Sequence, residues 1–262
     1  MNLITSLFLF LNVLVPFLFS SLTTKATSLH AQDLTSVLSI THSALLPAEK
    51  RDSHDEQTTP AVLRVVLKIV NTLARHRRDL VVHQLPLVVA TLAKILPLLT
   101  QPRPTVTSMR LRETIISSWP SWMAMGGEAL GVSEARELAR VMVTLTSRTT
   151  VRSHAKDSAS VGTMVGQLSK HAPALLMAYV RAVAHPYGMV PAEVRNALEP
   201  GLLALCETIH AGGKAQFGML GGQGVGDAFG LGEGDSETRE AEVEVWAELW
   251  RKWQSKRYTG QG

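Results

Sequence analysis

Cysteine and aromatic residues are scarce in this sequence. Its 262 residues include a single cysteine, Cys206, which excludes a disulfide within the chain and a cysteine-rich zinc site. Aromatic residues make up only 5% of the chain, and the apolar residues are mainly Leu, Val and Ala. This composition favours helices over a β-sandwich or barrel. Cys206 stands among apolar residues in "GLLALCETI", which predicts a buried structural thiol rather than a nucleophile.

Catalytic and metal-binding motifs are also lacking. The chain has no Walker A motif, no H-E-x-x-H and no G-x-S-x-G. "HRRDL" (76–80) resembles a kinase catalytic loop, but the other kinase motifs are missing, which favours a turn at a helix end. His30, His42 and His54 recur every twelve residues in a polar region, and we interpret this as coincidence rather than a metal site. We therefore expect no enzyme activity, no cofactor and no metal.

The apolar segment at the N-terminus, residues 3–19, has no charged residue. It could be a signal or membrane anchor, a buried helix, or sequence that is not native to the domain. No Lys or Arg precedes it, and Asn12 and Pro16 interrupt it, which speaks against a secretory signal. We therefore treat residues 1–57 as this segment plus a polar linker, and residues 58–262 as a helical C-terminal domain.

Helical periodicity runs through that domain. In 61–75 the polar residues Arg64, Lys68, Asn71 and Arg75 recur at steps of four and three, so they form one narrow stripe on an otherwise apolar helix. Pro60 suits the first turn of this helix. Similar patterns predict further helices at about 85–99, 108–119, 133–147 and 161–184. In the helix at 133–147, Ser133 is a candidate cap, and Glu137, Arg140 and Thr144 form the polar stripe. The succession predicts an all-α antiparallel helix array, similar to the end of a HEAT or armadillo solenoid.

Prolines punctuate the stretch from Lys170 to Ile209. Pro173 and Pro191 suit helix starts, "HPYG" (185–188) is a turn, and "EPG" (199–201) should break a helix. The prediction is therefore three helical pieces, at about 171–184, 191–199 and 201–210.

A glycine-rich segment, residues 212–235, separates this stretch from the last helix, and its composition predicts a flexible loop. The helix that follows carries Trp246, Leu249, Trp250 and Trp253 on one face. We expect this face to pack against the preceding helices.

Two basic clusters are candidates for contacting phosphates, and the net charge of +4 is compatible with a site near nucleic acid. They are "ARHRRD" (74–79) and "RKWQSKR" (251–257), and the second has an aromatic residue, Trp253, interleaved among its basic residues. The alternative is a solvated basic surface with the tryptophans turned to the core. The candidate residues for contact with a partner or RNA are Arg75, Arg77, Arg78, Arg251, Lys252, Lys256 and Arg257.

Three segments together carry a family likeness. They are "KHAPALLMAYV" (170–180), "VPAEVRNALEPGLLALCE" (190–207) and "WAELWRKWQSKRYTG" (246–260). In this order they resemble the C-terminal domain of the nucleolar pre-ribosome assembly proteins called unhealthy ribosome biogenesis protein two. The likeness covers roughly 60–262, and because members of the family are much longer, the chain resembles only their C-terminal part.

The resemblance implies a helical-repeat scaffold without catalytic activity. It implies a nucleolar protein that joins early large-subunit precursor particles and pre-rRNA processing, in association with a second large scaffold and a DEAD-box helicase. RNA contact is compatible with it, and no membrane partner is implied. The alternative function is a secreted or membrane-anchored helical interaction domain, which depends wholly on residues 3–19.

Overall fold

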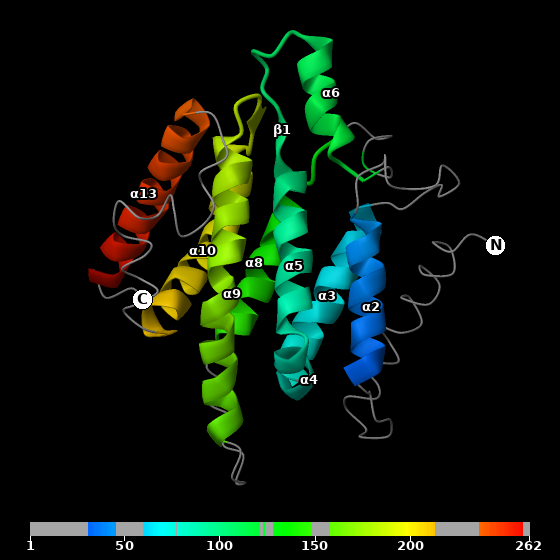
Figure 1. Ribbon diagram of the computed structural model, residues 1–262, viewed down its shortest axis with the longest axis vertical. Helices are drawn as coiled ribbons and strands as arrows, with labels where there is room; N and C mark the ends of the chain where they lie inside the picture. The colour runs from blue at the N-terminus through cyan, green and yellow to red at the C-terminus, as the bar shows by residue number, and fades with distance from the viewer. Residues whose placement is uncertain are drawn as a thin grey trace, which may run out of the picture.

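The computed structural model describes residues 31–45, 60–76, 78–120, 123, 128–147, 158–212 and 236–258. Nearly all regular structure in these ranges is helical, which confirms the predicted all-α class (Figure 1). In chain order the elements are α2 (Ala31–Ala44), α3 (Pro60–His76), α4 (Arg78–His83), α5 (Leu85–Ile95), the 3-10 helix η2 (Leu96–Leu99), β1 (Gln101–Pro102), α6 (Met109–Ser117), α8 (Val132–Thr146), α9 (Ser158–Ala184), β2 (Gly188–Met189), α10 (Ala192–Gly212) and α13 (Ser236–Tyr258).

The long helices form two layers. In one layer α5 packs between α2 and α9, and in the other α8 packs between α3 and α10 (Figure 1). Helix α13 closes one side of the molecule against α9 and α10. Each helix buries its apolar side between the layers, as the narrow polar stripes of the sequence require. The two-layer arrangement is compatible with a solenoid, which stays a prediction.

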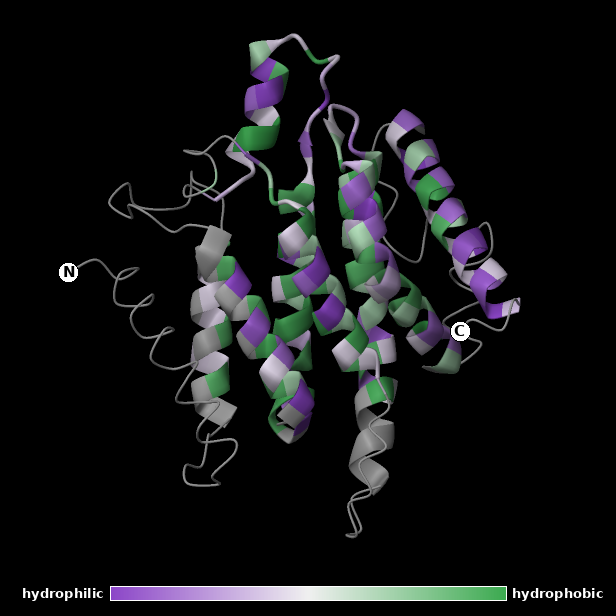
Figure 2. Cartoon of the chain, turned by 180° about the vertical axis from the view of Figure 1, so that it is seen from behind, coloured by the Kyte–Doolittle hydropathy of each residue, from purple (hydrophilic) through white to green (hydrophobic). Residues whose placement is uncertain are grey.

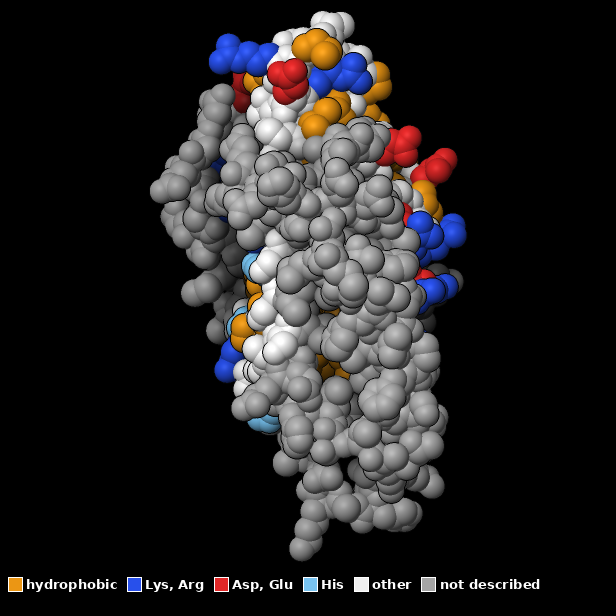
Figure 3. Space-filling model, turned by 90° about the vertical axis from the view of Figure 1, so that its right-hand side faces the viewer, with side chains coloured by type: hydrophobic (Ala, Val, Ile, Leu, Met, Phe, Trp, Pro, Cys, Tyr) orange, Lys and Arg blue, Asp and Glu red, His pale blue; other side chains and the backbone are white. Residues whose placement is uncertain are grey.

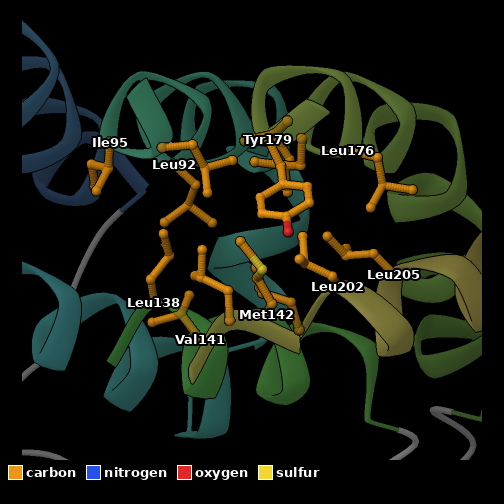
Figure 4. Close-up of a cluster of buried hydrophobic side chains, with 14 of the residues drawn as sticks. Leu92, Ile95, Leu138, Val141, Met142, Leu176, Tyr179, Leu202 and Leu205 are labelled. Atoms are coloured by element: carbon orange, nitrogen blue, oxygen red, sulfur yellow. The ribbon is translucent and has the colours of Figure 1, made fainter. Parts of the chain in front are cut away.

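The core lies between the layers (Figure 4). Leu92 of α5 and Leu176 of α9 face Leu138 and Met142 of α8, and all four side chains are at most 1% exposed. Burial of each such side chain stabilises the fold by about 1.5–3 kcal/mol. The packing is close where α10 crosses α8, because a Cβ at Gly201 would lie only 2.9 Å from the Cα of Ala139.

A short antiparallel pairing joins the ends of α5 and α9. Gln101 pairs with Met189 and Pro102 with Gly188. The hydroxyl of Thr100, which directly follows η2, donates to the Ala182 carbonyl in the last turn of α9 at 3.3 Å. This bond connects the C-terminal ends of the α5–η2 segment and of α9. The two helices therefore run in the same direction. The predicted turn at 185–188 lies directly before this pairing.

Two prolines that were predicted to begin or break helices lie inside them instead. Helix α9 continues through Pro173, and α10 continues through Pro200, so the predicted division at these points is wrong. An interior proline costs about 3 kcal/mol in a helix. Buried side chains on both sides of each proline offset this cost. They are Leu168, Ala172, Leu175 and Leu176 around Pro173, and Val194, Leu198, Leu202 and Leu205 around Pro200.

The structure also differs from the sequence predictions at the cap of α8 and at α2. Ser133 does not cap α8: the cap position is Gly131, whose N–H donates to the carboxylate of Glu134 at 3.1 Å, and the Ser133 hydroxyl donates to the other oxygen of that carboxylate. Helix α2 lies within the range predicted as a polar linker, yet its Leu34 and Leu38 are buried in the core. The linker reading therefore does not hold for this helix.

The apolar segment 3–19 and the glycine-rich residues 213–235 lie outside the described ranges, so the predictions made for them stay predictions. None of the described helices combines the length and the apolar character that a membrane crossing requires.

Candidate functional site

The first predicted cluster lies where α3 meets α4, and its residues have different roles. Arg75 is exposed, whereas Arg78 is half-buried. The Arg78 guanidinium donates from Nη2 to the Thr144 carbonyl and the Ser147 hydroxyl, both at 2.9 Å. It thus holds one carbonyl in the last turn of α8, where the helix dipole favours a cation. Burial lowers the pKa of Arg78. Arg78 is therefore an internal link between helices, and Arg77 lies outside the described residues.

The second predicted cluster, Arg251, Lys252, Lys256 and Arg257, is called the C-terminal cluster below. Its lysines meet carboxylates: Lys256 Nζ lies 2.6 Å from Glu199 of α10, and Lys252 Nζ lies 2.9 Å from Glu248. The hydrogen bond from Lys252 lowers the pKa of Glu248. Arg257 Nη1 lies 2.8 Å from Nδ1 of His210, and Arg251 is exposed and bonds to the Ala247 carbonyl of its own helix. Much of this cluster is engaged in contacts within the chain.

The aromatic face of α13 packs inward, as predicted. Trp246 and Trp253 are each 6% exposed, and Trp250 lies between them, its ring centroid 5.9 Å and 4.4 Å from theirs. The Trp253 indole N–H donates to Glu207 of α10 at 3.2 Å, and the Arg257 guanidinium lies over the same ring at 5.2 Å. We call Trp246, Leu249, Trp250 and Trp253, with the α9 and α10 residues they meet, the tryptophan seam. Its rings are occupied by packing rather than presented to bases.

A small cavity of about 120 Å³ lies between α9, α10 and α13. Arg195, Glu199, Glu248 and Lys252 line it with both signs of charge, and burial raises the pKa of the adjoining Tyr179 to about 12. At about 30 Å³ per water molecule, it has room for a few waters and not for a nucleotide.

Other chemically active groups are buried or isolated. Cys206 is 1% exposed, and burial raises its pKa to about 12, which confirms the predicted structural thiol. Burial, with the charge of Lys94, lowers the pKa of His42, while His30 and His54 lie outside the described residues. Within the described ranges, no three His, Cys, Asp or Glu side chains gather in a way that could hold a metal ion.

The polar stripes of α3 and α8, which sequence reasoning treated separately, lie side by side. Arg64 Nε forms an ion pair with the buried Glu134 at 2.9 Å, and the Thr144 hydroxyl donates to Asn71 at 2.7 Å. On the outer side of the same two helices, five basic side chains are exposed: Arg64, Lys68, Arg75, Arg136 and Arg140. We call these five the α3–α8 face, and the rear view shows hydrophilic residues on the helices that form it (Figure 2).

Sequence reasoning selected only Arg75 of this face as a candidate. The signal for the others was a repeat of basic residues at helical spacing on two separate helices, and only the contact between α3 and α8 combines the two repeats. The α3–α8 face and the C-terminal cluster do not come together, because α13 lies at one side of the molecule and α3 and α4 lie beyond α9 and α5 (Figure 1).

A third surface surrounds α6, which stands at the end of the two layers (Figure 1). Met109 is 69% exposed, and a cavity of about 570 Å³ is lined by Arg112, Glu113 and Glu128 among others. Side chains of both charges and of apolar type mix on the top of the molecule (Figure 3). This mixture favours no particular partner.

Comparison with known proteins gives a family match. A family model described as the Urb2/Npa2 family matches residues 12–261. The match begins within the apolar N-terminal segment and thus reaches further than the resemblance over 60–262. No curated protein and no solved structure matches significantly.

Proposed function

The chain belongs to the Urb2/Npa2 family of ribosome biogenesis proteins, and from this we propose that it is a non-catalytic scaffold in early large-subunit assembly and pre-rRNA processing. The observation that carries the proposal is the extent of the family match, which runs from residue 12 to residue 261. The helical architecture supports it, since stacked helices provide long surfaces for partners.

The chemistry of the described residues supports a scaffold rather than an enzyme. The thiol of Cys206 is buried with its pKa raised to about 12, so it is not a ready nucleophile. Arg78 and Glu134 are held in contacts between α3, α4 and α8, and Glu199 bonds Lys256 across α10 and α13. These groups link helices to one another, as expected of a rigid scaffold.

On this proposal the partners are a large-subunit precursor particle in the nucleolus, a second large nucleolar scaffold and a DEAD-box helicase. The family resemblance of 170–207 and 246–260 supports these partners. The described residues of those segments lie mainly in α9, α10 and α13, whose mutual packing would close one end of a helical-repeat array. The outer faces of the layers are then the surfaces available to partners.

The proposal is tested by following a C-terminally tagged chain through gradient sedimentation of a nuclear extract. We expect it to sediment with precursors of the large subunit, and its depletion to make large-subunit rRNA precursors accumulate. Small-subunit precursors, purified in parallel, serve as the control and should not retain it. Recovery of the chain from the medium or from membranes, cleaved near Ala26 or Ala31, would overturn the proposal in favour of the secreted or membrane-anchored alternative.

A further inference from the structure

The α3–α8 face concentrates the positive charge of the chain. Its five basic residues are accompanied on the two helices by only two carboxylates, Glu134 and Glu137, which leaves a net charge of +3 against +4 for all 262 residues. We propose that this face binds the phosphate backbone of an RNA duplex. This inference rests on the proposed function, which supplies the reason to expect RNA as the partner. The location of the site rests on the structure.

Among the described residues, the two carboxylates of these helices pair with two of the five cations and leave three without a carboxylate. Glu134 is occupied by Arg64, and Glu137 by Arg140. Lys68, Arg75 and Arg136 are exposed and form no ion pair with any residue in the described ranges. Exposed, unpaired cations at fixed positions attract phosphates and release their counterions on binding.

The arrangement of the two helices places Lys68 and Arg75 along α3 and Arg136 on α8 beside it. Contacts pair residue 64 with 134 and residue 71 with 144, and because both numbers rise together, α3 and α8 run in the same direction. This register puts Lys68 level with the turn at 137–140. At about 1.5 Å per residue, the row from Arg64 to Arg75 is about 16 Å long. The face therefore presents an extended basic strip rather than a single charge.

The composition of the face favours a nucleic-acid backbone over a protein partner. Neither α3 nor α8 contains Phe, Tyr or Trp, the residues that anchor most protein interfaces and that stack on single-stranded bases. Among the side chains of α3 and α8 that the structure describes, the exposed large apolar one is Val143, at 39%. Four of the five cations are arginines, whose planar guanidinium matches phosphate geometry. Proteins recognise RNA duplexes largely through phosphates and sugar hydroxyls, which need no aromatic platform.

The test measures binding of a fluorescein-labelled RNA duplex by fluorescence anisotropy. The full chain is titrated with a duplex of about 16 base pairs, the span of a double-stranded-RNA domain, at KCl between about 50 and 200 mM. Each contacted phosphate adds about −0.9 to the slope of log affinity against log salt, so Lys68, Arg75 and Arg136 predict a slope of about −3. Two duplexes of unrelated sequence should bind equally.

The decisive variant reverses two uncompensated charges, Lys68→Glu with Arg136→Glu. We expect it to weaken duplex binding at least about tenfold at the lowest salt and to reduce the slope by about 2. The matched control is Lys170→Glu with Arg110→Glu, which changes one Lys and one Arg at exposed positions of α9 and α6. It should keep most of the affinity. Circular dichroism melts of both variants establish that each is folded.

Three results would overturn the inference. The first is duplex affinity that is unchanged by the Lys68 and Arg136 reversal, and the second is an equal loss in the control. The third is tighter binding of a poly-glutamate chain than of the duplex, lost in the same variant, which would assign the face to an acidic protein segment. All three results concern binding by the purified chain. The scaffold proposal is tested by sedimentation with precursor particles, so the two proposals can fail independently.

Discussion

The α3–α8 face and the C-terminal cluster look alike in sequence and differ in the folded chain. Each has basic residues at helical spacing on an amphipathic helix. In the C-terminal cluster, Lys252 and Lys256 meet Glu248 and Glu199. On the α3–α8 face, Lys68, Arg75 and Arg136 meet no carboxylate of the described residues.

The difference lies in what the neighbouring helices supply. Helix α10 supplies Glu199, Glu207 and His210 as partners for side chains of α13. Helix α13 is therefore bound to α10 by polar contacts as well as by the packing of its tryptophans. The carboxylates of α8 are already occupied by Arg64 and Arg140. Basic residues that are equivalent in sequence thus become structural in one place and available for contact in the other. The predictions below test this division.

The largest expected effect is on the tryptophan seam. Trp253→Ala removes a 6% exposed ring that stacks on Trp250 and donates to Glu207. We expect the free energy of unfolding to fall by about 3–5 kcal/mol in urea titrations. Trp253→Phe, which keeps an aromatic ring, should lower the free energy of unfolding clearly less. A Trp253→Ala protein that unfolds like the parent but no longer joins precursor particles would make the seam a contact surface.

A smaller loss is expected at Gly201, where α10 crosses α8. The added Cβ of Gly201→Ala would lie 2.9 Å from the backbone of Ala139 and from the sulfur of Met142. Overpacking of this kind costs about 1–3 kcal/mol, measured by thermal unfolding. Gly166→Ala is the matched control, because nothing lies within 4 Å of its new Cβ. That variant should gain about 0.5–1 kcal/mol through helix propensity. Equal effects at both glycines would contradict the close packing.

The ion pairs of the C-terminal cluster should contribute less still. We expect Lys252→Gln with Lys256→Gln to cost about 0.2–1 kcal/mol per pair and less at high salt, because these side chains are about half exposed. Glu248 has a lowered pKa in the folded chain, so its contribution is present at neutral pH and is lost as the pH falls through that pKa. The gap in stability between parent and variant should therefore narrow in acid, and a gap that widens would be inconsistent with the pairing.

The smallest effect on stability is expected at the α3–α8 face. Arg136→Gln should change the free energy of unfolding by less than about 0.5 kcal/mol, since the side chain is exposed and unpaired among the described residues. The slope of log affinity for the RNA duplex against log salt should decrease in magnitude by about 1. Calorimetry and anisotropy on the same preparation give both values. Marked destabilisation would show that Arg136 is structural like Arg78.

Sequence patterns predicted those parts of the fold that depend on local periodicity. The stripe on α3, the packed face of α13 and the buried Cys206 follow from the spacing of apolar residues. Pro173 and Pro200 were misread because local rules weigh the cost of an interior proline without the tertiary burial that offsets it. The cap of α8 was misplaced because Gly131 uses the carboxylate of Glu134 in place of a hydroxyl of its own.

The candidate contact residues were harder to predict for the same reason. A basic cluster in a sequence does not show which charges are compensated by residues far along the chain. Arg78 reaches Thr144, and Lys256 reaches Glu199, over 66 and 57 positions. Conversely, Lys68 and Arg136 are prominent only once α3 lies beside α8. Such partnerships are set by helix packing, which local spacing does not specify.

The most direct test of this division is chemical crosslinking of the chain to RNA inside purified large-subunit precursor particles, followed by mass spectrometry of the crosslinked peptides. The account predicts crosslinks in peptides that contain Lys68, Arg75 or Arg136, and their loss in the Lys68→Glu, Arg136→Glu chain. Crosslinks confined to residues 251–258, or particles that hold the chain without any crosslink to α3 or α8, would contradict it.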